Sequence, residues 1–197
     1  MMVIGLTGGF GTGKTTVAQM LSKLGAKTID VDQISRDLTA PDKPLYRKYI
    51  ALFGPEIVQK NNQLNREKIA DIVFGDPIQR KRLEEISHPL IISEMNRQIE
   101  EQKREKNSVI VVDLPLLFED KLEKLFSRII VVYAKQEKVF NRIRKSRRMT
   151  FAQIRSRIAS QDPLSEKKAR ADIVINNNGT HAKTFTQVQR VYRLLSE

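Results

Sequence analysis

The chain has 197 residues, of which 40% are hydrophobic and 29% are charged, a composition typical of a folded globular domain rather than a disordered segment. It contains no cysteine, which excludes disulfides and thiolate metal sites. The 35 lysines and arginines outnumber the 23 acidic residues and give a formal net charge of +12. This excess indicates anionic partners, and nucleic acids and polyphosphate metabolites both qualify.

Hydrophobic segments of the sequence are all short. None approaches the roughly 20 residues that a membrane-spanning helix needs, so we expect no membrane partner. The apolar N-terminus reaches glycine within a few residues and lacks the cleavage site of a secretion signal. We therefore expect a cytoplasmic protein.

Runs of four to six residues rich in valine and isoleucine predict parallel strands, because they are too short for buried helices. A weaker run, ending before Asp32, predicts one more strand. In chain order, the predicted strands are residues 2–7, 27–31, 109–113, 128–133 and 172–175.

Helix signals fill the intervals between these runs. Gly25 predicts the end of the first helix in a left-handed conformation. Asp76 followed by Pro77 predicts a capped helix start, and Thr150 with Gln153 forms a capping-box pattern. Residues 32–106 contain only helical signals, which indicates a helical insertion in an otherwise alternating strand and helix order.

The segment from Gly8 to Thr15, GGFGTGKT, matches the phosphate-binding loop pattern G-x-x-x-x-G-K-[ST] between a predicted strand and a predicted helix. Glycines allow consecutive backbone N–H groups to converge on an anion at a helix N-terminus. Lys14 is then expected to reach the β- and γ-phosphates of ATP, Thr15 to coordinate Mg²⁺, and Thr16 to contact the α-phosphate. The sequence thus predicts a P-loop NTPase-type fold: a doubly wound, parallel, five-stranded α/β sheet with a helical insertion and a lid.

Two carboxylates, Asp30 and Asp32, follow at the end of the second predicted strand. Strand ends of this kind face the ligand crevice of an open parallel sheet. Asp32 is therefore a candidate base that orients an acceptor hydroxyl and takes its proton. The same residue also suits the N-cap of a helix beginning at Gln33, and the two roles are compatible.

Charge distribution bears on the class of partner. Seven basic residues and no acidic residue occur between Arg142 and Arg157. This cluster suits a lid over phosphates, and it lacks the interleaved aromatic residues that stack on nucleic-acid bases. A small-molecule kinase is favoured over a nucleic-acid-binding ATPase, and we expect no nucleic-acid partner. The residues considered so far do not distinguish a nucleoside monophosphate kinase from another small-molecule kinase.

Several further segments, taken in order with the phosphate-binding loop, resemble the dephospho-CoA kinase family from Val3 to about Gly179. They are IDVDQISRDL, SHPLI, DLPLLFE and RIASQDPLSEKKARADIVINNNG. The phosphate-binding loop is shared by many families, whereas the combination of these segments is distinctive. The resemblance implies transfer of a phosphoryl group from ATP to the ribose 3′-hydroxyl of dephospho-CoA, which gives CoA.

The resemblance also implies three groups of site residues. The catalytic group is Asp32, Lys14 and Arg142. The ATP-binding group is Gly8, Gly9, Gly11, Thr12, Gly13, Lys14, Thr15, Thr16, Arg142, Asn177 and Gly179. The acceptor-binding group is Asp32, Arg36, His88, Pro115, Leu116, Arg157 and Gln161. Asp113, at the end of a valine-rich run, is a further Mg²⁺ contact through a water, and His88 precedes a proline that alternatively marks a helix break.

The predicted organisation is one kinase domain with a core of about 1–31, 107–139 and 167–197, an acceptor subdomain of about 32–106 and a lid of about 140–166. The lid departs from the family, because Ser146, Arg147 and Arg148 stand where an Arg-Asp-Gly sequence is usual. The departure leaves open which lid arginine contacts the phosphates. The sequence makes no prediction of the oligomeric state.

Overall fold

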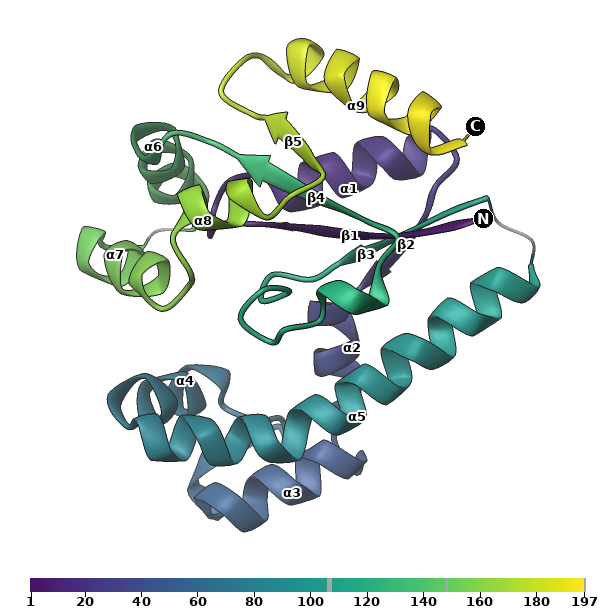
Figure 1. Cartoon of the computed structure of the whole chain (residues 1–197). Helices are drawn as coiled ribbons and strands as arrows, with labels where there is room; N and C mark the ends of the chain where they lie inside the picture. Colours follow the sequence, from purple (N-terminus) through teal and green to yellow (C-terminus); the bar gives the residue numbers. More distant parts are fainter. Residues whose placement is uncertain (106–107, 148, 197) are drawn as a thin grey trace. The chain divides into compact units, whose positions relative to one another are not determined.

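The computed structural model of the chain describes residues 1–105, 108–147 and 149–196 (Figure 1). The chain divides into two compact units, one formed by Met1–Asp30 with Ile99–Glu197 and the other by Val31–Gln98. The first unit contains the sheet, and the second is built from helices. The finer predicted division into core, acceptor subdomain and lid stays a prediction.

The first unit contains a five-stranded sheet whose strands are all parallel, in the order β2-β3-β1-β4-β5. The strands are β1 (Met2–Gly8), β2 (Lys27–Asp30), β3 (Val109–Asp113), β4 (Arg128–Tyr133) and β5 (Ile173–Asn176). This arrangement confirms the predicted fold class. The predicted strand positions are also correct to within one residue at either end. The signal is strongest for β1, β3 and β4, whose valine and isoleucine runs are buried on both faces.

Five helices of the first unit follow the strands. They are α1 (Lys14–Lys23), α6 (Gln136–Arg147), α7 (Phe151–Ala159), α8 (Leu164–Ala169) and α9 (His181–Ser196), and a short 3₁₀ turn, η2, spans Glu123–Leu125. Figure 1 shows α1 and α9 side by side on one face of the sheet. Their apolar faces join strand residues such as Ile4, Val111 and Ile130 in one buried cluster.

The loop after β3 packs against the sheet at Gly5 of β1. A side chain at this position would collide with Leu117 and Phe126, since an added Cβ would lie 2.5 Å from Leu117 Cδ1. Leu117 and Phe118 are fully buried, at 0% and 2% exposure. This loop is therefore part of the core, although its sequence resembles an ordinary connection.

The helical unit contains α2 (Val31–Leu38), α3 (Pro44–Phe53), the 3₁₀ turn η1 (Pro55–Ile57), α4 (Arg66–Gly75) and most of α5 (Pro77–Arg104). Its own core joins residues of α3, η1 and α4, with Leu45, Tyr49 and Ile57 at its centre. Among the described residues, no helix combines the length and the apolar character that crossing a bilayer requires.

The predicted helix ends are confirmed at three places. Gly25 has φ +110° after α1, Asp76 Oδ1 accepts the backbone N–H of Ile78 at 2.8 Å, and Thr150 forms its capping box. Two of the alternative interpretations are wrong. Helix α2 begins at Val31, so Asp32 lies in its first turn and is not an N-cap. Helix α5 continues through Pro89, so His88-Pro89 does not mark a helix break.

Candidate active site

The phosphate-binding loop connects the carboxyl end of β1 to the start of α1. Gly11 and Gly13 have φ values of +73° and +95°, a region that residues with a Cβ rarely adopt. Neighbouring side chains also leave no room for a Cβ at these positions. An added Cβ on Gly11 would lie 2.5 Å from Ile143, and one on Gly13 would collide with the side chain of Asn177. The backbone N–H groups of the first turn of α1 have no partner within the helix, which makes this end of α1 an anion-binding position.

Several carbonyl groups of the loop accept hydrogen bonds from neighbouring groups. Lys14 Nζ donates to Gly8 O at 3.2 Å, and Thr12 Oγ1 donates to Gly9 O at 2.9 Å. A further bond of 2.8 Å runs from Asn177 Nδ2 to Thr12 O. In a trans peptide the C=O and N–H groups point in opposite directions, so holding Thr12 O on one side directs the N–H of Gly13 to the other. The loop is thus held in one shape by its surroundings.

Asn177 follows β5, the edge strand of the sheet, and is only 6% exposed. Its Oδ1 accepts a 2.9 Å hydrogen bond from Thr184 Oγ1 of α9, and its backbone O accepts one of 2.7 Å from Arg142 Nη2 of α6. Arg142 Nη1 also lies 3.4 Å from Thr12 O. The structure thus brings together the sequence-predicted residues Arg142, Asn177 and Thr12. Gly179 lies in the exposed turn that leads to α9.

The segment from α6 to α8 also contacts the phosphate-binding loop. Gln161 Oε1 accepts the backbone N–H of Phe10 at 2.8 Å, and the guanidinium of Arg157 lies 5.5 Å from the centre of the Phe10 ring. Both predicted acceptor-side residues therefore lie beside the loop. Phe10 contributes its side chain as well as its backbone to this contact. Arg148 lies outside the described residues, and the side chains of Ser146 and Arg147 are not described either, so the lid departure is not resolved here.

A buried ion pair joins α8 to the turn after β3. Lys167 is 0% exposed, and its Nζ lies 2.6 Å from Glu119 Oε1 and 3.4 Å from Pro115 O. Pro115 O also accepts the hydroxyl of Thr7, the residue before Gly8, at 3.1 Å. Pro115 and its neighbour Leu116 are half-buried in this turn. The ion pair therefore ties α8 to the turn that contains both residues, and the Thr7 hydroxyl ties this turn to the strand that precedes the phosphate-binding loop.

Two oxygen donors in the first unit suit Mg²⁺. Thr15 lies in the first turn of α1 and is exposed, while Asp113 is the last residue of β3 and has a buried Oδ1. Asp113 pairs in register with Leu6 of β1 on one side and with Asp30 of β2 on the other. Hydroxyl and carboxylate oxygens are ligands that Mg²⁺ prefers, so these residue types fit the ion.

The remaining predicted residues belong to the helical unit. Asp32 and Arg36 are both exposed, one turn apart on α2, and the chain enters this helix directly from Asp30 at the carboxyl end of β2. His88 is half-buried on α5. Arg36 also lines a cavity within the helical unit, together with Arg66, which the sequence analysis did not single out.

Three residues beside the phosphate-binding loop were missed from the sequence. Thr184 had a usable signal, because it shares the buried face of α9 with Val188, Val191 and Leu195 and is the polar residue in that series. Lys167 and Glu119 had none, since lysine and glutamate are rarely buried and a pattern analysis assigns them to the surface.

Comparisons with known proteins agree with this geometry. The model of the dephospho-CoA kinase family matches residues 2–183. A dephospho-CoA kinase of Bacillus anthracis is 42% identical over 192 residues, covering 98% of this chain and 96% of the relative. One of Geobacillus kaustophilus is 38% identical with the same coverage.

Solved structures show the same fold. A dephospho-CoA kinase from Campylobacter jejuni superposes with a TM-score of 0.73 at 26% identity, covering 98% of this chain and 96% of the other. A Thermus thermophilus protein reaches 0.84 at 28% identity, covering 100% and 98%. Shikimate kinase from Acinetobacter baumannii, at 17% identity and a TM-score of 0.55 over 99% and 93%, shares the fold alone. With a family model matched over most of its length and full-length relatives at about 40% identity, the chain belongs to the dephospho-CoA kinase family.

Proposed function

We propose that this chain transfers the γ-phosphoryl group of ATP to the ribose 3′-hydroxyl of dephospho-CoA, giving CoA and ADP in the last step of CoA synthesis. The observation that carries the proposal is the braced phosphate-binding loop between β1 and α1, in a chain whose family is matched over residues 2–183. The loop supports ATP as the phosphoryl donor, and the family supports dephospho-CoA as the acceptor.

On the donor side, the backbone N–H groups of residues 13–16 bind the phosphates of ATP, and Lys14 neutralises the β- and γ-phosphates. For this role Lys14 leaves Gly8 O, to which it is bonded at 3.2 Å. Arg142 and the turn containing Asn177 and Gly179 contact the nucleotide in this proposal, with Asn177 and Gly179 beside the adenine base. Asn177 contacts the nucleotide through its backbone only, because both ends of its side-chain amide are bonded to protein groups. Its side chain holds the phosphate-binding loop in place.

Thr15 and Asp113 are the residues that would hold Mg²⁺, Asp113 through a water. Mg²⁺, when bound, neutralises charge on the β- and γ-phosphate oxygens of ATP. The exposed position of Thr15 and the buried Oδ1 of Asp113 support this assignment.

On the acceptor side, Asp32 accepts the proton of the ribose 3′-hydroxyl as the oxygen of that hydroxyl bonds to the γ-phosphorus. The bond between the γ-phosphorus and the β–γ bridging oxygen breaks at the same time, which releases ADP. Arg36 and His88 contact the acceptor, as do Pro115 and Leu116. Arg157 and Gln161 approach the phosphates from the lid and exclude water from the transfer.

The distribution of charge supports a polyphosphate ligand at the unit that contains the phosphate-binding loop. Residues 31–98 contain 11 basic and 10 acidic residues, so the helical unit is nearly neutral. The remaining residues contain 24 basic and 13 acidic residues, so the excess positive charge belongs to the unit with the phosphate-binding loop. A field of this sign attracts ATP. A cytoplasmic location suits both substrates and is part of the proposal.

A coupled ADP-release assay with a panel of acceptors tests the function. With Mg²⁺ and ATP, dephospho-CoA is expected to be the acceptor with the highest kcat/KM, well above AMP and other nucleoside monophosphates. Rapid phosphorylation of AMP with none of dephospho-CoA would contradict the proposal and favour a nucleoside monophosphate kinase. Hydrolysis stimulated by duplex or single-stranded nucleic acid, with a steep salt dependence of binding, would favour a nucleic-acid-binding ATPase.

A further inference from the structure

Glu119, in the turn after β3, uses one carboxylate oxygen for two contacts within the first unit. Its Oε1 accepts the backbone N–H of Asp162 at 3.0 Å and lies 2.6 Å from Nζ of Lys167. Asp162 belongs to the connection between α7 and α8, residues 160–163, and Lys167 is a residue of α8. The carboxylate therefore fixes this connection to the turn after β3, and the fully buried lysine holds the carboxylate in place.

Gln161 is the residue through which the same connection reaches the phosphate-binding loop. Its Oε1 accepts the backbone N–H of Phe10 at 2.8 Å. The nitrogen of Asp162 lies in the planar peptide group that also contains the Cα of Gln161, so the two atoms move together. The hydrogen bond to Glu119 thus sets where the side chain of Gln161 begins, and that side chain ends on the phosphate-binding loop.

Lys167 extends this network to Pro115. Its Nζ lies 3.4 Å from Pro115 O, which also accepts the hydroxyl of Thr7 at 3.1 Å. Thr7 directly precedes the first glycine of the phosphate-binding loop. Glu119 and Lys167 therefore contact two segments of the proposed site, residues 160–163 and the turn with Pro115, and both segments are bonded to the chain around the loop.

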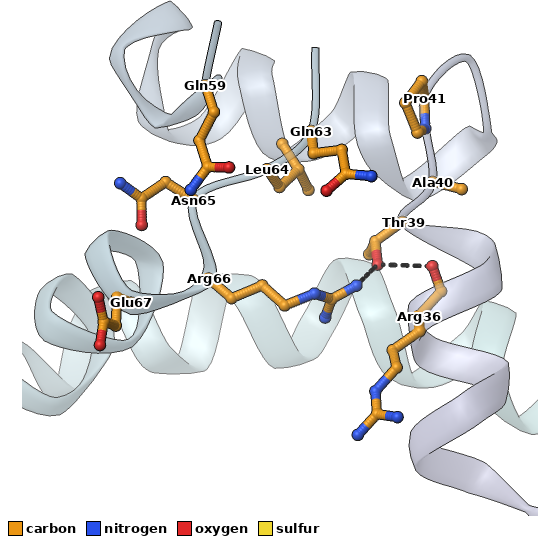
Figure 2. Close-up of a pocket in the computed structure, with 10 residues that line it drawn as sticks. All are labelled: Arg36, Thr39, Ala40, Pro41, Gln59, Gln63, Leu64, Asn65, Arg66 and Glu67. Carbon is orange, nitrogen blue, oxygen red and sulfur yellow. Dashed lines mark hydrogen bonds between the residues drawn. The ribbon is translucent and has the colours of Figure 1, made fainter. Parts of the chain in front are cut away.

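A cavity of about 70 Å³ lies where residues 160–163 face the phosphate-binding loop, with Gly9, Phe10 and Gln161 among the residues that line it. The cavity of about 470 Å³ in the helical unit, whose wall carries polar groups such as Arg66, is much larger (Figure 2). The small cavity is below the range of nucleotide sites, so it is a gap in the packing and not a ligand site. Close packing alone therefore does not set the position of residues 160–163, and the hydrogen bonds made by Gln161 and Asp162 have that role.

Stability alone does not require a buried ion pair at this place. Taking two charges out of water costs free energy that their attraction only partly returns, so apolar replacements of similar size are often neutral for stability. A carboxylate differs from an apolar side chain because it accepts hydrogen bonds with a defined direction. The bond to the N–H of Asp162 is therefore the feature of Glu119 that a leucine of similar size would lack.

We propose that Glu119 and Lys167 are positioning residues for phosphoryl transfer, which hold Gln161 against the phosphate-binding loop through the backbone of Asp162. This inference rests on the proposed function, because the reaction that they serve is transfer from ATP to dephospho-CoA. With Gln161 in place, water is excluded and each ATP consumed gives one CoA. Without it, the oxygen of a water bonds to the γ-phosphorus in place of the ribose 3′-oxygen, which gives ADP and inorganic phosphate and leaves dephospho-CoA unchanged.

The test compares two double variants that both remove the ion pair. Lys167→Met with Glu119→Leu has no acceptor for the N–H of Asp162, whereas Lys167→Met with Glu119→Gln keeps an oxygen there. The measurements are kcat for CoA formation and the ratio of ADP to CoA formed with both substrates saturating. This ratio does not depend on the fraction of folded protein, so a merely structural loss leaves it unchanged. Glu166→Gln, which removes an exposed carboxylate of α8, is the control and should keep the wild-type values.

The wild-type ratio is expected to be close to one. The leucine double variant should raise it to about two or more and lower kcat for CoA formation about ten-fold, the equivalent of one lost hydrogen bond. The glutamine double variant should stay within about two-fold of the wild type in both values. Gln161→Leu, which leaves the ion pair intact, should raise the ratio in the same way as the leucine double variant.

A wild-type ratio in either the leucine double variant or Gln161→Leu would overturn the positioning role. Equal losses in the leucine and glutamine double variants would also overturn it, because the effect would then not follow the acceptor for Asp162. Wild-type protein that binds ATP but does not phosphorylate dephospho-CoA would overturn the proposed function, and this inference with it.

Discussion

The side-chain amide of Asn177 donates a 2.8 Å hydrogen bond to the backbone oxygen of Thr12, across 165 positions of the sequence. The other end of the same amide accepts the hydroxyl of Thr184. Asn177 therefore links the end of β5 and the start of α9 to the phosphate-binding loop. The shape of that loop depends on a residue that a motif search over Gly8–Thr15 does not include.

Replacing Asn177 with alanine is expected to weaken ATP binding and to lower stability. The change leaves the Thr12 oxygen with only the 3.4 Å contact from Arg142 and the Thr184 hydroxyl with only a 3.3 Å bond to Thr180 O, at a cost of about 1–3 kcal/mol. We expect the Kd for ATP to rise by about ten-fold, because the loop is no longer held in one shape. Titration calorimetry and urea unfolding measure the two effects.

Thr184→Val is the matched control for the Asn177 variant. It removes the bond to Asn177 Oδ1 but leaves the bond to Thr12, so it should lower stability with little change in the Kd for ATP. Equal weakening of ATP binding by the two variants would show that the contact with Thr12 has no special role.

Asp32→Asn is expected to lower kcat for dephospho-CoA by about 10²–10⁴, because a general base contributes by that factor. The KM for ATP should be little changed, since the phosphate-binding loop is intact. Asp37→Asn, on the same helix, is the control, because Asp37 is exposed and its carboxylate accepts from Gln33 within α2. Steady-state ADP release measures all three proteins. Near-wild-type turnover of the Asp32→Asn variant would show that Asp32 is not the general base.

Lys167→Met is expected to destabilise the protein by about 3–5 kcal/mol, because the largely buried carboxylate of Glu119 would lose its counter-charge and keep only the backbone N–H of Asp162. Lys167→Met combined with Glu119→Leu should recover much of the loss, since neither charge is then present. Lys168→Met, at the exposed neighbouring position, is the control. Unfolding in urea at pH 7 gives the three values. A double variant as unstable as the single variant would argue that the cost comes from packing and not from the unpaired charge.

Tyr49 gives the helical unit a pH dependence in the alkaline range. Burial raises the pKa of Tyr49 above its ordinary value of 10.0, although the hydrogen bond with Ser87 and the charge of Arg66 act in the opposite direction. A raised pKa in the folded state means that stability is complete below pH 10 and is lost as the pH rises through the folded pKa. Urea unfolding from pH 8 to 11.5 should show a steeper loss above pH 10 in the wild-type protein than in Tyr49→Phe. Equal slopes would contradict this.

The fold was predictable because its signals are local. Runs of valine and isoleucine indicated four of the five strands, and a weaker run indicated β2. Gly25, Asp76 and Thr150 indicated helix ends. The errors have a common cause in tertiary context. Helix α5 continues through Pro89 because flanking residues such as Leu90 and Ile91 pack against the core of the helical unit, which outweighs the lost backbone hydrogen bond.

Prediction of the candidate site was more uneven. The phosphate-binding loop was recognised from spacing alone, since its glycines and lysine are consecutive. The contacts that hold it, from Asn177, Arg142 and Gln161, come from segments more than 120 positions away, and no local pattern indicates which atoms they bond. Arg66 had no signal in the sequence, because the cavity that it lines is formed by three separate segments.

Identification of the product formed from ATP and dephospho-CoA tests the central claim most directly. Phosphorus NMR of the reaction, with mass spectrometry of the purified nucleotide, is expected to show one new phosphate monoester on the ribose 3′-oxygen and one ADP for each dephospho-CoA consumed. Unchanged dephospho-CoA in the presence of ATP and Mg²⁺, or a phosphate on a different oxygen, would contradict the account.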